Sequence, residues 1–211
     1  MPENRPDTSR SFEPRISNLD SCLRLWRIHS NEFAANEFNP TVPTDKSGGR
    51  FDTLAGDYAY LYAGSDVKAA VAETLLRDRP PEKVYYQIPD VRIRGKSLSE
   101  IRLRFDLEVV KLHGNGPAAI GQEDNWITSC SSKYYPITRE WASAIRGWAP
   151  GASGIVYRPR HDNDRFAYVF FDDRCPDCPF ETIGSKPIDM AGPGAMMIRD
   201  AVMDYNALFK L

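Results

Sequence analysis

Short segments in which apolar and polar residues alternate every second position are the feature that most constrains this fold. Such alternation is typical of half-buried β-strands, and turn residues rather than long helical patterns separate the segments. We expect strands at residues 22–28, 58–63, 84–88, 107–112, 154–157 and 166–171. The last two flank the polar turn at residues 161–164, so we expect them to form a hairpin.

Three other segments carry apolar residues at helical spacing. We expect helices at about residues 66–77, 137–148 and 198–209. Ser65 is the expected N-cap of the first helix, whose apolar stripe is formed by Val67, Val71 and Leu75. Strands and helices in this irregular order predict the α+β class, with a compact mixed-sheet core and peripheral helices.

The bulk properties describe one domain and exclude several classes of partner. The chain has 211 residues, enough to bury a core without disulfides or metals. Its net charge of −2 provides no broad cationic field, so we expect no direct binding of nucleic acid. Residues 1–20 are polar and contain proline, which predicts a flexible N-terminus before a single domain at 21–211 that ends in the C-terminal helix. No apolar run resembles a signal peptide or a membrane span, so we expect a cytoplasmic protein without membrane contact.

Cysteine and histidine usage predicts no metal site. Without an export signal, the four cysteines are expected to be thiols. Cys175 and Cys178 have the spacing of half a zinc site or of a redox pair, but a second pair is missing, so we interpret them as structural thiols in a loop. The histidines are dispersed in the sequence, and His29 is interpreted as structural although it follows the strand that carries Arg27.

Two arginines lie where a scaffold does not require them. By alternation, Arg27 points to the same side as the leucines of its strand, and burying a guanidinium is costly unless an anion or a carboxylate meets it. The Ser-Gly-Gly-Arg-Phe turn at 47–51 presents Arg50, and the absence of side chains at positions such as Gly49 would let backbone N–H groups approach an anion. These features suggest part of a pyrophosphate clamp, although glycine pairs also mark ordinary turns.

Tyr62 and Glu73 are the candidate residues of the next strand and helix. A strand-to-helix turn between them would bring both side chains to one cleft. An aromatic ring can stack on nicotinamide, and a carboxylate can stabilise positive charge that develops at an anomeric carbon. The alternative for Glu73 is a surface ion pair with Arg77, four residues later, and spacing alone favours this simpler interpretation.

A resemblance to a known family favours the first interpretation. The sequence resembles the RES-domain family, which is named for arginine, glutamate and serine residues, over roughly residues 22–171. The matching segments are LWRIH (25–29), SGGRF (47–51), YLYAGSDVKAAVAE (60–73), YYPITREWASAI (134–145) and GIVYRPRHD (154–162). The resemblance implies a fold similar to the ADP-ribosyltransferases. It also implies degradation of NAD+ by phosphorolysis or hydrolysis, in a toxin that an Xre-type antitoxin restrains.

The family residues transfer to this chain one by one. The resemblance places the first arginine at Arg27, the Gly-Gly-Arg arginine at Arg50, the tyrosine at Tyr62 and the glutamate at Glu73. It thereby implies that Arg27 and Glu73 act in catalysis and that Arg50, Tyr62 and Gly49 bind the substrate.

The serine of the family does not transfer. Pro159 occupies the expected hydroxyl position, and proline also lacks a backbone N–H. Ser153, Arg158 and Arg160 are the candidates for compensation, and the two arginines are also candidates for binding a phosphate co-substrate.

Three functions remain open at this point. The first is cleavage of NAD+ as a substrate, without any resident cofactor and with inorganic phosphate or water as the acceptor. The second is transfer of ADP-ribose to a macromolecule, and the third is a noncatalytic module that binds a nucleotide or an antitoxin. The sequence also leaves the oligomeric state open, a homodimer included.

Overall fold

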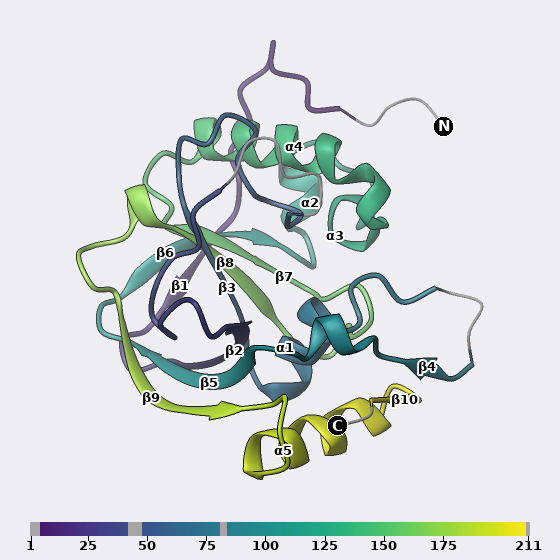
Figure 1. Cartoon of the computed structure of the whole chain (residues 1–211). Coiled ribbons are helices and arrows are strands. Elements are labelled where there is room, and N and C mark those ends of the chain that lie inside the picture. Colours follow the sequence, from purple (N-terminus) through teal and green to yellow (C-terminus); the bar gives the residue numbers. More distant parts are fainter. Residues whose placement is uncertain (1–4, 42–47, 81–83, 210–211) are drawn as a thin grey trace.

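A curled, mixed β-sheet forms the centre of the molecule (Figure 1). The computed structural model describes residues 5–41, 48–80 and 84–209. Across these residues the sheet has eight strands in the order β1 (Ile16–Leu19), β6 (Leu107–Leu112), β7 (Gly154–Tyr157), β8 (Ala167–Phe171), β3 (Tyr60–Gly64), β2 (Arg24–Ser30), β5 (Lys96–Leu103) and β9 (Phe180–Pro187). Only β6 and β7 pair in parallel; the other neighbours are antiparallel.

The sheet curls until strands from its two ends share one core. Leu19 of β1 and Leu107 of β6 belong to the same buried cluster as Ile101 of β5 and Phe180 of β9. Because β1 and β9 are the edge strands, this shared cluster requires the concave face of the sheet to fold over itself. The curled sheet therefore supplies its own interior packing, and the helices cover its outer surface.

Two groups of helices cover different parts of that outer surface (Figure 1). The short helices α2 (Gly116–Ala119) and α3 (Trp126–Ser129) and the longer α4 (Tyr135–Trp148) lie near β6, β7 and β8, and the buried face of α4 contributes Trp141 and Ile145 to their core. Helices α1 (Val67–Thr74) and α5 (Pro193–Met203) form a second core with β2 and β5. Short 3-10 turns are present at η1 (Asp90–Arg92), η2 (Ser132–Tyr134) and η3 (Asp172–Arg174), and β4 (Tyr86–Gln87) pairs in parallel with β10 (Ala207–Leu208). The prediction of an α+β domain with a mixed-sheet core and peripheral helices is confirmed.

Most predicted elements are present, and their boundaries are corrected by the structure. Helix α1 begins after Asp66, whose side chain accepts a hydrogen bond from the N–H of Ala69, so the N-cap is Asp66 and not Ser65. The C-terminal helix ends at Met203, because the chain turns at Asn206, with a φ of 49°, and continues into β10. The strand expected at 84–88 is reduced to the two residues of β4.

Three strands of the eight-stranded sheet, β1, β5 and β9, were not predicted. The prediction of a flexible N-terminus over 1–20 is wrong for Ile16–Leu19, which pairs with β6. Strand β5 escaped the alternation test because the polar residues Ser97 and Ser99 are buried in it. Strand β9 is an edge strand whose residues are mostly exposed, so it carries little apolar signal.

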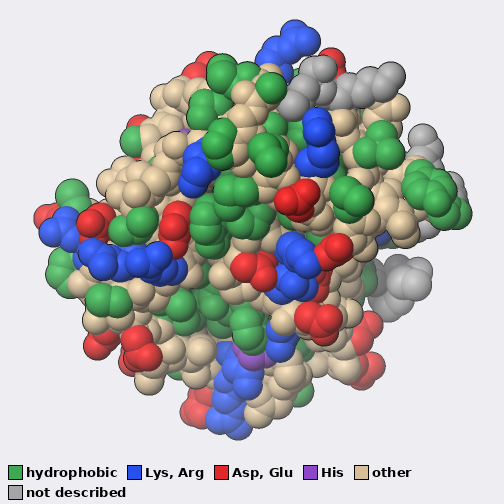
Figure 2. Space-filling view, turned by 90° about the horizontal axis from the view of Figure 1, so that it is seen from below, with side chains coloured by type: hydrophobic (Ala, Val, Ile, Leu, Met, Phe, Trp, Pro, Cys, Tyr) green, Lys and Arg blue, Asp and Glu red, His purple; other side chains and the backbone are tan. Residues whose placement is uncertain are grey.

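The face that contains α5 shows how charge is distributed on the surface. In Figure 2, acidic and basic side chains alternate there with apolar ones, and neither sign of charge dominates the view. Among the described residues, no helix has the length and apolar character needed to cross a membrane.

Candidate active site

A cleft of about 540 Å³ collects the residues that the sequence singled out. Its walls come from β2, β3, the end of α1, η1, the start of α4 and the turn at Gly48–Arg50. Arg27, Gly49, Arg50, Tyr62 and Glu73 all line it, although they are far apart in sequence. The fold therefore brings the two arginines and the glutamate to one cavity.

Arg27 reaches the cleft from the middle of β2 and is almost completely buried. Its Nη1 donates hydrogen bonds to the carbonyl oxygens of Ala35 (2.9 Å) and Glu37 (2.8 Å), and its Nη2 donates to Asn39 Oδ1 (3.3 Å). Burial lowers the pKa of the guanidinium to about 10, which still leaves it cationic at neutral pH. Most of its donors hold the segment after β2, so Arg27 contributes charge to the cleft while fixing its wall.

Arg50 is buried to a similar degree and is held by the helices on the other side of the cleft. Its Nη1 donates to the carbonyl oxygens of Ile127 (3.1 Å) and Cys130 (3.2 Å). The guanidinium also lies 4.9 Å from the ring centroid of Tyr135, which is within cation–π distance. The side chain thus connects the turn at 48–50 to the end of α3 and the start of α4.

The glycine turn is fixed by Asp52 and Tyr62. The Asp52 carboxylate accepts hydrogen bonds from the N–H of Gly49 and from the Tyr62 hydroxyl (3.0 Å), and the hydroxyl itself accepts one from the N–H of Phe51 (2.8 Å). Arg139 Nε donates to the carbonyl oxygen of Gly49 (3.1 Å). A Cβ at Gly49 would lie 2.5 Å from Asp52 Oδ1 and 2.6 Å from the Tyr62 hydroxyl. The glycine is therefore required for this close packing. Its N–H donates to the Asp52 side chain and is not available to a bound ligand.

Glu73 faces the cleft from the last turn of α1. Its Oε2 accepts a hydrogen bond from the Tyr157 hydroxyl (2.9 Å), and the backbone N–H of Arg160 also donates to this carboxylate. Burial raises the pKa of Glu73, whereas the nearby Arg50 and the Tyr157 hydrogen bond oppose that rise. The carboxylate is thus a partly desolvated anion beside a buried cation, unlike the surface ion pair that spacing alone favoured.

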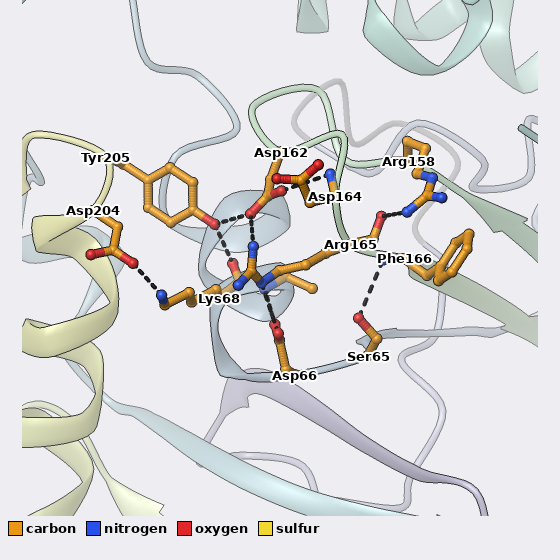
Figure 3. A network of polar contacts seen from close by, with 11 residues as sticks. Ser65, Asp66, Lys68, Arg158, Asp162, Asp164, Arg165, Phe166, Asp204 and Tyr205 are labelled. Carbon is orange, nitrogen blue, oxygen red and sulfur yellow. Dashed lines mark hydrogen bonds and ion pairs between the residues drawn. The ribbon is translucent and has the colours of Figure 1, made fainter.

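The N-terminus of α1 is anchored by a polar network on the outside of the molecule (Figure 3). Arg165 donates from Nε to Asp66 Oδ2 (2.7 Å) and from Nη1 to Asp162 Oδ2 (2.8 Å). The hydroxyl of Tyr205 donates to the same Asp162 oxygen, and Lys68 forms an ion pair with Asp204. These contacts join three distant segments at the beginning of the helix that carries Glu73, so they fix its direction.

The charges around the cleft are strongly unequal. Of the described residues that line it, five are arginine or lysine, namely Arg27, Arg50, Arg77, Arg92 and Lys96, and Glu73 is the single acidic one. An excess of cations in a concave site favours an anionic ligand. The described part of the chain contains no group of three or more histidine, cysteine or acidic residues placed to hold a metal ion.

The family of the protein follows from its sequence. Residues 24–188 match the RES domain, which is well over half of the chain. The chain belongs to the RES-domain family. The site residues that the resemblance implied all lie within the matched region, and no significant match was found among curated proteins.

The fold of this RES domain is also similar to a solved structure. A chain in the crystal structure of the M. tuberculosis MbcT–MbcA toxin–antitoxin complex superposes with a TM-score of 0.57. The two chains are 14% identical, and the similarity covers 85% of this chain and 89% of that one. At this identity the likeness establishes the fold alone.

Arg158 and Arg160 do not line the cleft with their side chains, contrary to the prediction that they bind substrate. Arg158 Nη1 donates to the carbonyl oxygen of Arg165 (3.2 Å), and its guanidinium lies 3.8 Å from the centroid of the Phe166 ring (Figure 3). Arg160 contributes its backbone N–H to Glu73 instead of a side chain to the cavity. Both arginines lie on the loop that leaves β7, and neither is among the residues that line the cleft.

The position of the missing serine is also resolved. Pro159 is buried directly before the residue whose N–H meets Glu73. Ser153 is buried beside β7, where its hydroxyl donates to the carbonyl oxygen of Arg174 (2.9 Å), so it does not replace the family serine in the cleft. Ser47 of the predicted turn lies outside the described residues.

Several residues of this RES domain were not recognised as site residues from the sequence. Tyr157 was quoted only as part of a motif, yet it is the hydroxyl donor to Glu73. Arg139 lies on the buried face of α4 and packs against the glycine turn, and a charged residue among the core positions of that helix was the available signal. No sequence pattern identifies Lys96 and Arg92 as site residues, because they reach the cleft from the unpredicted β5 and from η1.

His29 and Cys175 have the surroundings of structural groups. His29 lines the cleft, but its Nε2 lies 2.8 Å from Ser99 Oγ and its Nδ1 lies 2.9 Å from the carbonyl oxygen of Ser30, and burial lowers its pKa. A neutral imidazole satisfied on both nitrogens adds no charge to the site. The four cysteines are free, and burial raises the pKa of Cys175 to about 12, so its thiol is unreactive.

Proposed function

We propose that this RES domain degrades NAD+ by cleaving the bond between nicotinamide and ribose. The observation that carries the proposal is the half-buried Glu73 carboxylate, which lies in a cleft whose other charged lining residues are all arginine or lysine. NAD+ presents a pyrophosphate that such cations attract and a ribose carbon at which positive charge develops as the pyridine leaves. One cleft would therefore bind the pyrophosphate and stabilise the charge at the ribose carbon.

Each site residue has a distinct task in this mechanism. Arg27 and Arg50 supply positive charge for the pyrophosphate, and the hydrogen bonds to backbone carbonyls keep both guanidinium groups in place before substrate arrives. The Glu73 carboxylate stabilises the oxocarbenium-like transition state, while the Tyr157 hydroxyl orients it. The Tyr62 hydroxyl is occupied by the glycine turn, so we assign to Tyr62 only its ring face, which lines the cavity for the nicotinamide or its ribose.

The chain would act as a cytoplasmic toxin of a toxin–antitoxin pair. The support is membership of the RES-domain family and a fold shared with a chain of the MbcT–MbcA toxin–antitoxin complex. We accordingly propose an antitoxin partner of the Xre type.

Incubation of the purified protein with NAD+, with and without inorganic phosphate, tests the activity. We expect free nicotinamide together with ADP-ribose or its 1''-phosphate. Covalently modified protein would instead indicate transfer of ADP-ribose to a macromolecule, and NAD+ that stays intact would indicate a noncatalytic module. Either of those results contradicts the proposal.

Glu73→Gln is the variant that tests the mechanism. The amide keeps the shape and the hydrogen bond from Tyr157 but removes the negative charge, so we expect nicotinamide release to fall by about 100-fold or more. Glu108→Gln is the matched control, since Glu108 is an exposed residue of β6 that does not line the cleft. Thermal unfolding of both variants checks that the fold is retained. Turnover at the wild-type rate in Glu73→Gln would remove this carboxylate from the mechanism.

A further inference from the structure

The loop between β7 and β8 contacts both ends of α1. We call residues 158–166 the β7–β8 loop. At the start of the helix, Arg165 Nε donates a hydrogen bond to Oδ2 of Asp66, the N-cap residue (2.7 Å). At the other end, the backbone N–H of Arg160 donates to the Glu73 carboxylate. One loop therefore holds the helix that carries Glu73 and also contacts the carboxylate itself.

Asp162 fixes the conformation of the β7–β8 loop. Its Oδ1 accepts a hydrogen bond from the N–H of Asp164 (3.0 Å). Its Oδ2 accepts one from Arg165 Nη1 (2.8 Å) and one from the hydroxyl of Tyr205 (Figure 3). The Asp162 side chain is only 7% exposed, and hydrogen bonds shielded from water are stronger than exposed ones. The loop is thus held in place two residues after Arg160, whose N–H meets the carboxylate of the cleft.

Tyr205 brings a segment from outside the family match to this loop. It follows α5 and lies beyond residues 24–188, which match the RES domain. Its ring packs against the core shared by α1 and α5. Its hydroxyl donates to Asp162 and lies 3.4 Å from the carbonyl oxygen of Lys68 in α1. The C-terminal segment is therefore connected to the loop that contacts Glu73.

We propose that Tyr205 is a positioning residue that holds the N–H of Arg160 on the Glu73 carboxylate. It acts through its hydrogen bond to Asp162 and hence through the β7–β8 loop, and it does not line the cleft itself. The inference rests on the proposed cleavage of NAD+, in which Glu73 must be ionised. A hydrogen bond donated to a carboxylate favours the ionised form, so a displaced loop would leave less of that form at a given pH.

The other groups that face Glu73 come from elements outside the β7–β8 loop. These charged or titratable neighbours are Arg50 of the glycine turn, Arg77 after α1, Tyr135 of α4 and Tyr157 of β7. None of them bonds to the Tyr205 hydroxyl. A change in the pKa of Glu73 on loss of that hydroxyl therefore reports on the loop.

Tyr205→Phe tests the proposal, because it keeps the ring on its core and removes only the hydroxyl. We expect the pKa of Glu73, followed by NMR titration of its side-chain carboxyl carbon, to be higher than in the wild type. We also expect the acidic limb of the kcat profile to move to higher pH and nicotinamide release at neutral pH to fall about threefold.

Asp204→Asn is the matched control. Asp204 precedes Tyr205, and its ion pair with Lys68 also joins the C-terminal segment to α1, but it does not involve the β7–β8 loop. We expect the wild-type pKa of Glu73 and the wild-type rate in this variant. Thermal unfolding of both variants checks that the fold is retained.

Asp162→Asn provides a second test from the other side of the same hydrogen bond. It removes the charge that Tyr205 and Arg165 contact, so we expect the pKa of Glu73 to rise at least as much as in Tyr205→Phe.

The NMR titration separates this inference from the proposed function, since it needs no turnover. If the wild type releases no nicotinamide but the pKa of Glu73 still rises in Tyr205→Phe, Tyr205 positions the carboxylate and the proposed function fails. An unchanged pKa in Tyr205→Phe, or an equal rise in Asp204→Asn, overturns the inference. A slower reaction without a change in the pKa of Glu73 overturns it as well.

Discussion

The cations that line the cleft form two sets, which are held in opposite ways. Arg27 and Arg50 donate most of their hydrogen bonds to backbone carbonyl oxygens of the protein itself. In the other set, Arg77 and Arg92 share the carboxylate of Asp78, and the ammonium of Lys96 makes no hydrogen bond among the described residues. The first arrangement builds the cavity and the second leaves charge available to a ligand. Arginines that line the same pocket therefore need not have the same role.

The largest expected effect is a difference in folding free energy between variants of the two sets. Arg50→Met removes the donors to Ile127 and Cys130 and leaves buried carbonyl oxygens without them, which costs about 2–5 kcal/mol of folding free energy. Arg92→Met breaks only a half-buried ion pair and should cost about 1 kcal/mol or less. Urea unfolding of both variants gives the comparison. Equal losses of stability would show that Arg50 and Arg92 do not differ in structural role.

A smaller effect concerns the pH dependence of Glu73. Because burial raises its pKa, the ionised form that the mechanism needs is lost, as pH falls, earlier than for an exposed glutamate. Tyr157→Phe removes a hydrogen bond to the charged form and should raise this pKa further, so the acidic limb of the kcat profile moves to higher pH and the rate at neutral pH falls by about tenfold.

The same raised pKa affects stability with a definite sign. The folded state holds the Glu73 proton at pH values where the unfolded chain has released it, so this group lowers stability as pH rises from the ordinary value of 4.5 through the raised one. For the Tyr157→Phe experiment, Tyr168→Phe serves as the control, because Tyr168 is a buried tyrosine of β8 that does not line the cleft. If the kcat profile shifts equally in Tyr157→Phe and Tyr168→Phe, the Tyr157 hydroxyl does not set the pKa of Glu73.

The smallest expected effect is at Pro159. The donors to Glu73 are the Tyr157 hydroxyl and the N–H of Arg160, and neither depends on the side chain at 159. Pro159→Ser should therefore change kcat/KM for NAD+ by about threefold or less. A gain far above this value would mean that the proline attenuates the enzyme and that the family serine acts directly on the substrate.

The sequence predicted which residues share a cleft better than it predicted the strands of the sheet. Arg27 was found because a charged residue in an apolar alternation needs a buried partner, and the structure supplies those partners from residues 35 to 39. Arg50 and Glu73 were assigned by family likeness, since a glycine turn and a helical spacing have ordinary explanations. Strand β5 was missed, because its buried serines break the pattern that identifies a strand.

The wrong assignments concern residues whose roles depend on distant contacts. Arg158 looked like a phosphate ligand, but its direction is set by the ring of Phe166 across the hairpin. Gly49 looked like an anion-binding amide, yet its N–H is already taken by Asp52, three residues later. Lys96 was missed, because its charged neighbours Arg92 and Arg77 come from η1 and from the segment after α1. None of these relations is visible in local periodicity.

The strand order decides when during synthesis the cavity can exist. β3, which precedes the helix of Glu73, pairs with β8, and the tyrosine that orients Glu73 is on β7, far along the chain. A ribosome must therefore deliver roughly four fifths of the polypeptide before these strands can meet, and contacts of such long range form late. Under the proposed function, a nascent chain cannot degrade NAD+ until β8 has emerged. Premature termination before that strand would yield inert fragments.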